Sequence, residues 1–67
     1  MKYYNKKRIA RMNWTPVDII VKNPQEVKRW CQLNASTGKF YYQPYRRVWL
    51  FESPEDAIVF SLNWVGR

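Results

Sequence analysis

Basic and aromatic side chains alternate between Lys39 and Trp49, and this stretch carries the residue types best suited to bind an anionic ligand with aromatic groups. Arginine and lysine can neutralise phosphates, while tyrosine rings can stack on nucleic-acid bases. The residues that we expect to make these contacts are Lys39, Tyr41, Tyr45, Arg46 and Arg47. The pattern favours nucleic acid, either DNA or RNA, but it matches no ribonucleoprotein motif, helix-turn-helix or KH loop.

A second basic stretch lies at the beginning of the sequence, where residues 1–13 contain five lysines and arginines and no acid. We expect them to form a basic N-terminal arm, in which Lys6, Lys7, Arg8 and Arg11 follow a phosphate backbone. The alternative is a solvated, frayed terminus.

The whole chain has twelve lysines and arginines against five acids, a formal net charge of +7. This balance favours an anionic partner, whether nucleic acid, an acidic membrane surface or an acidic protein. The simplest alternative is that the charge keeps a small protein soluble.

Residues for catalysis or metal binding are scarce. There is no histidine, and the single cysteine, Cys31, can form no disulfide within the chain and is expected to be a small buried hydrophobe. Two glycines are too few for a dinucleotide fingerprint or a phosphate-binding loop. We therefore expect a protein that is not an enzyme and needs no cofactor or metal.

No apolar run is long enough to span a bilayer, and no apolar stretch follows the basic residues of the N-terminus. Together with the lone cysteine, this predicts a soluble, cytoplasmic protein.

The elements that must position the basic residues can be read from the capping and turn signals. Asn23 and Ser53 each precede a proline and an acidic residue, which predicts a helix start at both places. The expected elements are strand 17–22, a helix from Pro24 to about Asn34, strands 39–43 and 46–52, and a helix from Pro54 to about Val65. They predict one small β-α-β-β-α domain over residues 14–67. Its fold class is α+β, a three-stranded, mainly antiparallel sheet with two helices on one face.

The register of the hairpin decides which side chains are exposed. A two-residue loop at Pro44-Tyr45 would pair Phe40 with Trp49, whereas a three-residue loop would pair Tyr41 with Trp49. We expect Phe40, Trp49 and Phe51 in the core, because a domain of 67 residues needs its largest apolar groups there.

The second helix is apolar around more than half of its circumference. Either the first helix packs beside it, which we favour, or part of the apolar surface is a contact for a partner. The residues expected at such a contact are Val59, Phe60, Asn63 and Trp64. A homodimer would be another way for so small a domain to complete its core.

The C-terminal third also resembles a known group of proteins. The residues Trp49-Leu50-Phe51-Glu52, Glu55-Asp56-Ala57, Phe60, Leu62 and Trp64 are similar to a pattern in small uncharacterised proteins of T4-like tailed phages. The resemblance implies a short accessory protein made in the cytoplasm of an infected bacterium. Such proteins often bind host machinery, so the alternative function is a phage effector that modulates a host protein through this helix or the sheet face.

Overall fold

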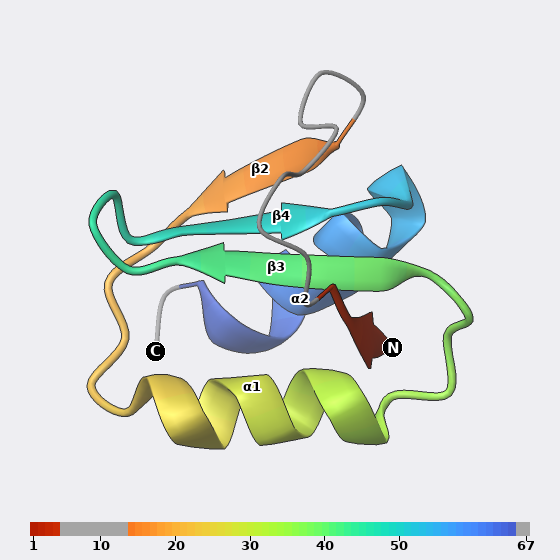
Figure 1. Cartoon of the computed structure of the whole chain (residues 1–67), viewed down its shortest axis with the longest axis horizontal. Coiled ribbons are helices and arrows are strands. Elements are labelled where there is room, and N and C mark those ends of the chain that lie inside the picture. The colour runs from red at the N-terminus through yellow and green to blue at the C-terminus, as the bar shows by residue number, and fades with distance from the viewer. Residues whose placement is uncertain (5–13, 66–67) are drawn as a thin grey trace.

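The computed structural model describes residues 1–4 and 14–65, and it confirms an α+β domain (Figure 1). The elements are β1 (Lys2–Tyr3), β2 (Thr15–Asp18), α1 (Pro24–Leu33), β3 (Lys39–Gln43), β4 (Val48–Phe51) and α2 (Pro54–Trp64). The predicted arm residues Lys6, Lys7, Arg8 and Arg11 lie outside the described residues.

The prediction of a three-stranded, mainly antiparallel sheet is wrong, because the described residues form a four-stranded mixed sheet in the order β1-β3-β4-β2. The additional strand, β1, runs parallel to β3. Its backbone bonds to the edge of β3: the N–H of Lys2 donates to the carbonyl of Gly38 at 3.1 Å, and that of Tyr4 donates to the carbonyl of Phe40 at 2.8 Å. The Met1 nitrogen donates to the carbonyls of Cys31 and Asn34 at the end of α1, where the helix dipole favours positive charge.

Strand β2 lies at the other edge of the sheet and begins earlier than expected. It covers Thr15–Asp18 instead of residues 17–22, because its partner β4 has only four residues and all of them pair with this segment. Pro16 is tolerated within β2 because an edge strand leaves one side of its backbone unpaired.

The hairpin of β3 and β4 has neither of the two expected registers. Gln43 pairs with Val48, so the turn contains the four residues 44–47 and both arginines lie in it. The observed register differs from that of the two-residue loop by two positions, which leaves every side chain on the same face. Phe40, Trp49 and Phe51 are therefore fully buried, as predicted.

Both helices contribute to one core, with α2 behind the sheet and α1 below it in the view of Figure 1. The ring of Trp30 in α1 packs edge-on against Phe60 and Trp64 of α2, with centroids 6.1 and 6.0 Å apart. The prediction that the first helix packs beside the second is confirmed. The buried cluster is Met1, Val27, Cys31, Phe40, Trp49, Phe51, Ala57 and Phe60.

The two helix starts differ. The Asn23 side chain accepts from the backbone N–H groups of Gln25 and Glu26 at 3.1 and 3.4 Å, as expected for a cap. Ser53 occupies the capping position of α2 but makes no capping hydrogen bond with its side chain. Asp56, expected in solvent, is buried and accepts from the Ser36 hydroxyl at 2.7 Å. It thereby ties the loop after α1 to the first turn of α2.

Candidate nucleic-acid interface

The tip of the β3–β4 hairpin presents three of the predicted contact residues to solvent. Tyr45 is completely exposed, and Arg46 and Arg47 are exposed beside it. The Arg46 N–H donates to the carbonyl of Gln43 at 3.2 Å and closes the turn. Arg47 has φ of +56°, a left-handed conformation in which a residue with a Cβ is strained. The turn therefore displays two guanidinium groups and a phenol ring on a fixed backbone.

A second basic and aromatic cluster lies at the other end of β3. Lys2 and Lys39 are register partners on β1 and β3, and both side chains are exposed. The Lys39 Nζ lies 5.9 Å from the centre of the Tyr4 ring, which in turn contacts Trp14 with a centroid distance of 5.2 Å. This cluster joins two amines to two rings at the sheet edge.

Sequence reasoning found Lys39 in this cluster but missed Tyr4 and Trp14. The two adjacent tyrosines of Lys2–Tyr4 are compatible with an extended strand, and this was the available signal. Trp14 carried no signal of its own, because its contact with Tyr4 depends on where the chain returns to the sheet.

Tyr3 connects this cluster to helix α1. The Lys28 Nζ lies over the Tyr3 ring at 4.0 Å from its centre, a cation–π contact. The ring also stacks on Tyr41, with centroids 5.7 Å apart. Burial raises the pKa of the Tyr3 hydroxyl, and a hydrogen bond with the backbone of Tyr42 opposes this rise. Tyr41, a predicted contact, is thus half-buried and packed by Tyr3.

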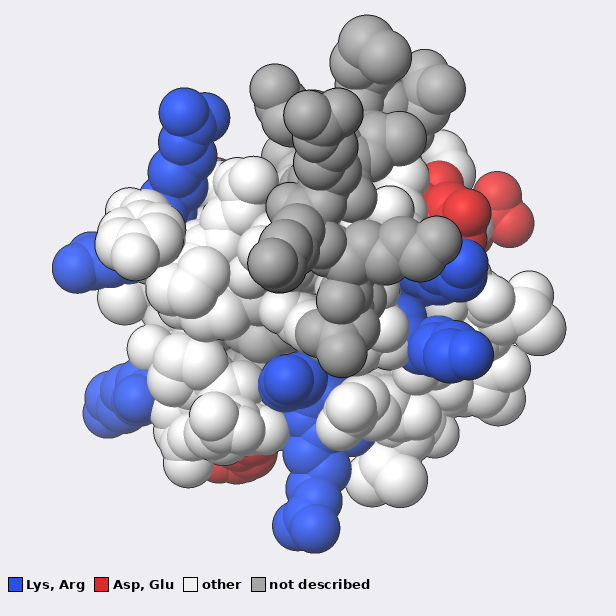
Figure 2. Space-filling model, in the orientation of Figure 1, with Lys and Arg blue, Asp and Glu red and all other residues white. Residues whose placement is uncertain are grey.

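The structure separates the predicted site residues into two groups. Lys39 lies at the start of β3, about 13 Å from Gln43 at its other end at roughly 3.3 Å per residue. Tyr41 lies nearer the tip, because it lines a shallow pocket together with Tyr45 and Arg46. Figure 2 shows the sheet face opposite α2, where the blue Lys and Arg side chains stand in separate groups around the margin. An acid lies near one group, because Glu52 Oε1 accepts from the backbone N–H of Lys39 at 3.1 Å. The tip is therefore the more strongly cationic of the two groups.

Tyr4 and Trp14 both lie at the sheet, because the Tyr4 N–H bonds to β3 and Trp14 directly precedes β2. The contact between the Tyr4 and Trp14 rings brings these two residues together.

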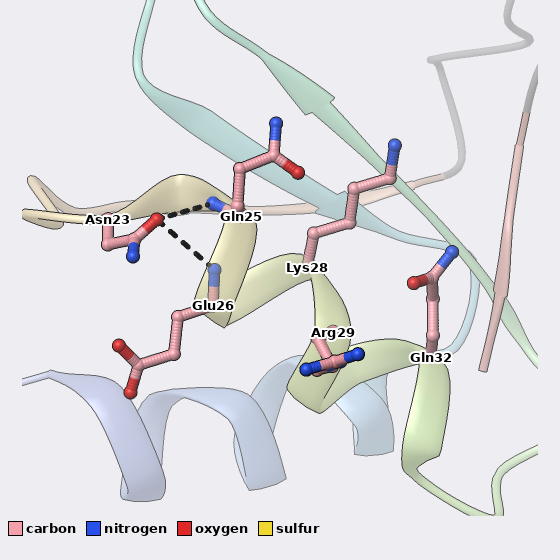
Figure 3. Close-up of a pocket in the computed structure, with 6 residues that line it drawn as sticks. All are labelled: Asn23, Gln25, Glu26, Lys28, Arg29 and Gln32. Carbon is pink, nitrogen blue, oxygen red and sulfur yellow. Dashed lines mark hydrogen bonds between the residues drawn. The ribbon is translucent and has the colours of Figure 1, made fainter.

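A polar hollow lies on the outer surface of α1 (Figure 3). It is lined by Asn23, Gln25, Glu26, Lys28, Arg29 and Gln32. All of these come from the helix or its cap, and Figure 3 shows Glu26 pointing away from Lys28 and Arg29. The hollow is a space between neighbouring side chains of one helix, and it brings together no groups from different elements.

The residues expected at a partner contact on α2 are only partly available. The expectation for Phe60 is wrong, because its side chain is fully buried between Trp30, Phe51 and Trp49. Trp64 is half-buried and packs against the core. Asn63 is also half-buried, and Val59 is 45% exposed.

The described residues contain no cluster of three or more side chains able to hold a metal ion. Cys31 is completely buried, and this burial raises the pKa of its thiol to about 12, so it cannot supply a thiolate at neutral pH. Neither of the described helices is long and apolar enough to cross a membrane.

No protein-family model, curated protein sequence or solved structure matches this chain.

Proposed function

We propose that this protein binds nucleic acid non-enzymatically, with the hairpin tip as its principal contact. The observation that carries the proposal is the conformation of Arg47. A left-handed backbone position in a turn normally holds glycine or asparagine, because other residues are strained there. Here the position holds an arginine, next to exposed Arg46 and fully exposed Tyr45. A strained backbone that lowers the stability of the fold suggests that the arginine side chain is needed for function.

The chemistry of the tip suits a flexible nucleic-acid strand. Each guanidinium can make paired, charge-assisted hydrogen bonds to phosphate oxygens. The Tyr45 ring can stack on a base, and such stacking tolerates any base. Lys39 and Lys2 at the other end of β3 would contact the same strand further along. We expect strong salt dependence and weak sequence preference.

An acidic host protein is the second candidate partner, as proposed for an accessory phage protein. The cationic tip could also bind an acidic protein surface. The observation that favours a protein partner is the exposed apolar surface of α2 at Ile58 and Leu62. This candidate predicts one partner that remains bound after nuclease treatment.

The test is fluorescence anisotropy with labelled single-stranded and double-stranded oligonucleotides. A double variant, Arg46→Ala with Arg47→Ala, removes the tip charges. Its matched control, Lys22→Ala with Arg29→Ala, removes the same charge from exposed positions in and before α1. We expect the tip variant to lose about a hundredfold or more in affinity, since each of the two lost contacts to a charged group contributes about 1.5–3 kcal/mol. Equal losses in both variants would show that net charge alone causes binding.

A further inference from the structure

An apolar groove runs between the edge strand β2 and helix α2. Its lining residues are Thr15, Pro16, Val17, Pro54, Ala57, Ile58, Ser61, Leu62 and Val65. None of them is charged. Three aliphatic side chains on α2 and at its C-cap are largely exposed: Leu62 at 82%, Ile58 at 59% and the C-cap residue Val65 at 53%. They point away from α1, because the residues of α2 that contact α1 lie on the opposite side of the helix.

Within residues 1–4 and 14–65, no strand pairs with β2 on the side away from β4, which leaves backbone hydrogen-bonding groups of β2 available there. Directly after β4, the N–H of Glu52 donates to the carbonyl of Lys39 in β3 at 2.9 Å. Backbone groups of successive strand residues point to opposite sides, so Leu50 also faces β3, while Trp49 and Phe51 face β2.

The pairing of β2 with β4 determines which backbone groups of β2 point outward. Val17 and Thr15 are the register partners of the β4 residues that face β2, so their backbone groups bond to β4. Pro16 and Asp18 then face the free edge. Proline has no N–H to lose at this position. The free edge therefore offers the carbonyl of Pro16 together with the N–H and carbonyl of Asp18.

We propose that a second copy of this chain binds along this edge, so that two β2 strands pair antiparallel about a twofold axis at Val17. In this register the N–H of Asp18 in each copy donates to the carbonyl of Pro16 in the other. Both hydrogen bonds use available groups, and neither needs the N–H that proline lacks. The result is one sheet that continues through both copies, with all four helices on the same face.

The position of α2 fits this arrangement. Helix α2 packs against both β2 and β4, which places its axis about half a strand spacing inward from β2. With strands about 4.8 Å apart, the two α2 axes of a dimer would be separated by roughly 10 Å. Packed helices are about 8–10 Å apart. The exposed side chains Ile58, Leu62 and Val65 of the two copies would therefore meet across the twofold axis and fill both grooves.

The distribution of charge also favours a second copy as the occupant. A chain with net charge +7 repels itself wherever its basic residues meet, but no lysine or arginine among the described residues lines this groove. The outward residue Asp18 would face Pro16 and not the Asp18 of the other copy, so the acids do not oppose each other. The described lining of the groove also carries no charged group that would select a different, charged partner.

Sedimentation velocity of the full chain over a concentration range from about 1 μM to about 1 mM tests the proposal. Leu62→Lys places a charge in the interface. Leu33→Lys is a matched control, because Leu33 is equally exposed, at 79%, on α1. We expect the unchanged protein and Leu33→Lys to dimerise, and Leu62→Lys to remain monomeric. A monomer throughout for the unchanged protein, or dimerisation of Leu62→Lys at the same concentration, would overturn the proposal.

A cross-link locates the interface independently of helix substitutions. The two Val17 residues would form a pair without hydrogen bonds between them, with Cα atoms about 4.5 Å apart, which is within disulfide range. Val17→Cys should give a covalent dimer on oxidation, while the buried native Cys31 stays unreactive. Lys39→Cys on β3 is the control and should stay monomeric. Absence of the Val17→Cys cross-link, or an equal yield for Lys39→Cys, would refute the pairing of the two β2 strands.

Discussion

Truncating two neighbouring residues of α2 should change stability by very different amounts. Phe60 is completely buried, with its ring centre 4.8 Å from that of Phe51 and 5.5 Å from that of Trp49. Replacing such a side chain with alanine costs about 3–5 kcal/mol. A domain of 67 residues has a total stability of roughly 3–10 kcal/mol at about 0.05–0.15 kcal/mol per residue. Phe60→Ala should therefore lose about a third or more of the stability of the fold.

Val59→Ala should stay within about 0.5 kcal/mol of the unchanged protein. The side chain is 45% exposed, and the apolar contact that it loses is offset by the higher helix propensity of alanine. Urea denaturation followed by tryptophan fluorescence measures both variants. Phe60→Leu, which keeps most of the buried volume, should lose much less than Phe60→Ala. Similar losses of unfolding free energy for Val59→Ala and Phe60→Ala would refute the assignment of Phe60 to the core.

Three further predictions concern single positions. At pH 8 the Cys31 thiol should be about a thousandfold less ionised in the folded protein than in the unfolded chain, because burial raises its pKa from 9.0 to about 12. Its reaction with a thiol-specific reagent should therefore be slow until urea is added. The free energy of unfolding should fall as pH rises from 9 towards 12, because only the unfolded thiol ionises in this range. Gly38→Ala should cost about 1–3 kcal/mol in urea denaturation, because a Cβ there would overlap the Asp56 carboxylate, and the cost should shrink in an Asp56→Ala background. Arg47→Gly should raise the unfolding free energy by about 0.5–1 kcal/mol and weaken nucleic-acid binding, whereas Arg46→Gly should weaken binding without stabilising the fold.

Local signals in the sequence were sufficient for the helices and for part of the core, although not for Phe60. The side chain of Asn23 caps α1 as predicted, and Phe40, Trp49 and Phe51 are buried as predicted. The burial prediction survived an incorrect register because a shift of two residues preserves the alternation of faces. These features depend on residues close together in the chain, or on the need of a small domain to bury its largest groups.

The features that could not be predicted depend on distant segments. The pairing of β1 with β3 joins residues more than thirty positions apart, and nothing in Lys2–Tyr3 indicates a parallel partner. The end of β2 at Asp18 is set by the length of β4 and not by the β-branched residues that follow. Asp56 had the sequence position of a capping residue, but its hydrogen bond to Ser36 depends on how the loop after α1 returns to α2.

The same limitation applied to the candidate site. Tyr45, Arg46 and Arg47 could be predicted as exposed because a proline-containing turn between two strands projects into solvent. The cluster of Lys2, Tyr4 and Trp14 with Lys39 could not be predicted, because it is formed by the additional strand.

The salt dependence of oligonucleotide binding tests the proposed function most directly. Binding constants for a single-stranded oligonucleotide would be measured by anisotropy between about 50 and 200 mM salt for the unchanged protein and for the variant with Arg46→Ala and Arg47→Ala. Each lost phosphate contact reduces the slope of log K against log salt concentration by about 0.7, so we predict a slope smaller by roughly 1.4 in the variant. An identical slope for both proteins, or binding that does not depend on salt, would contradict the proposal that the hairpin tip neutralises phosphates.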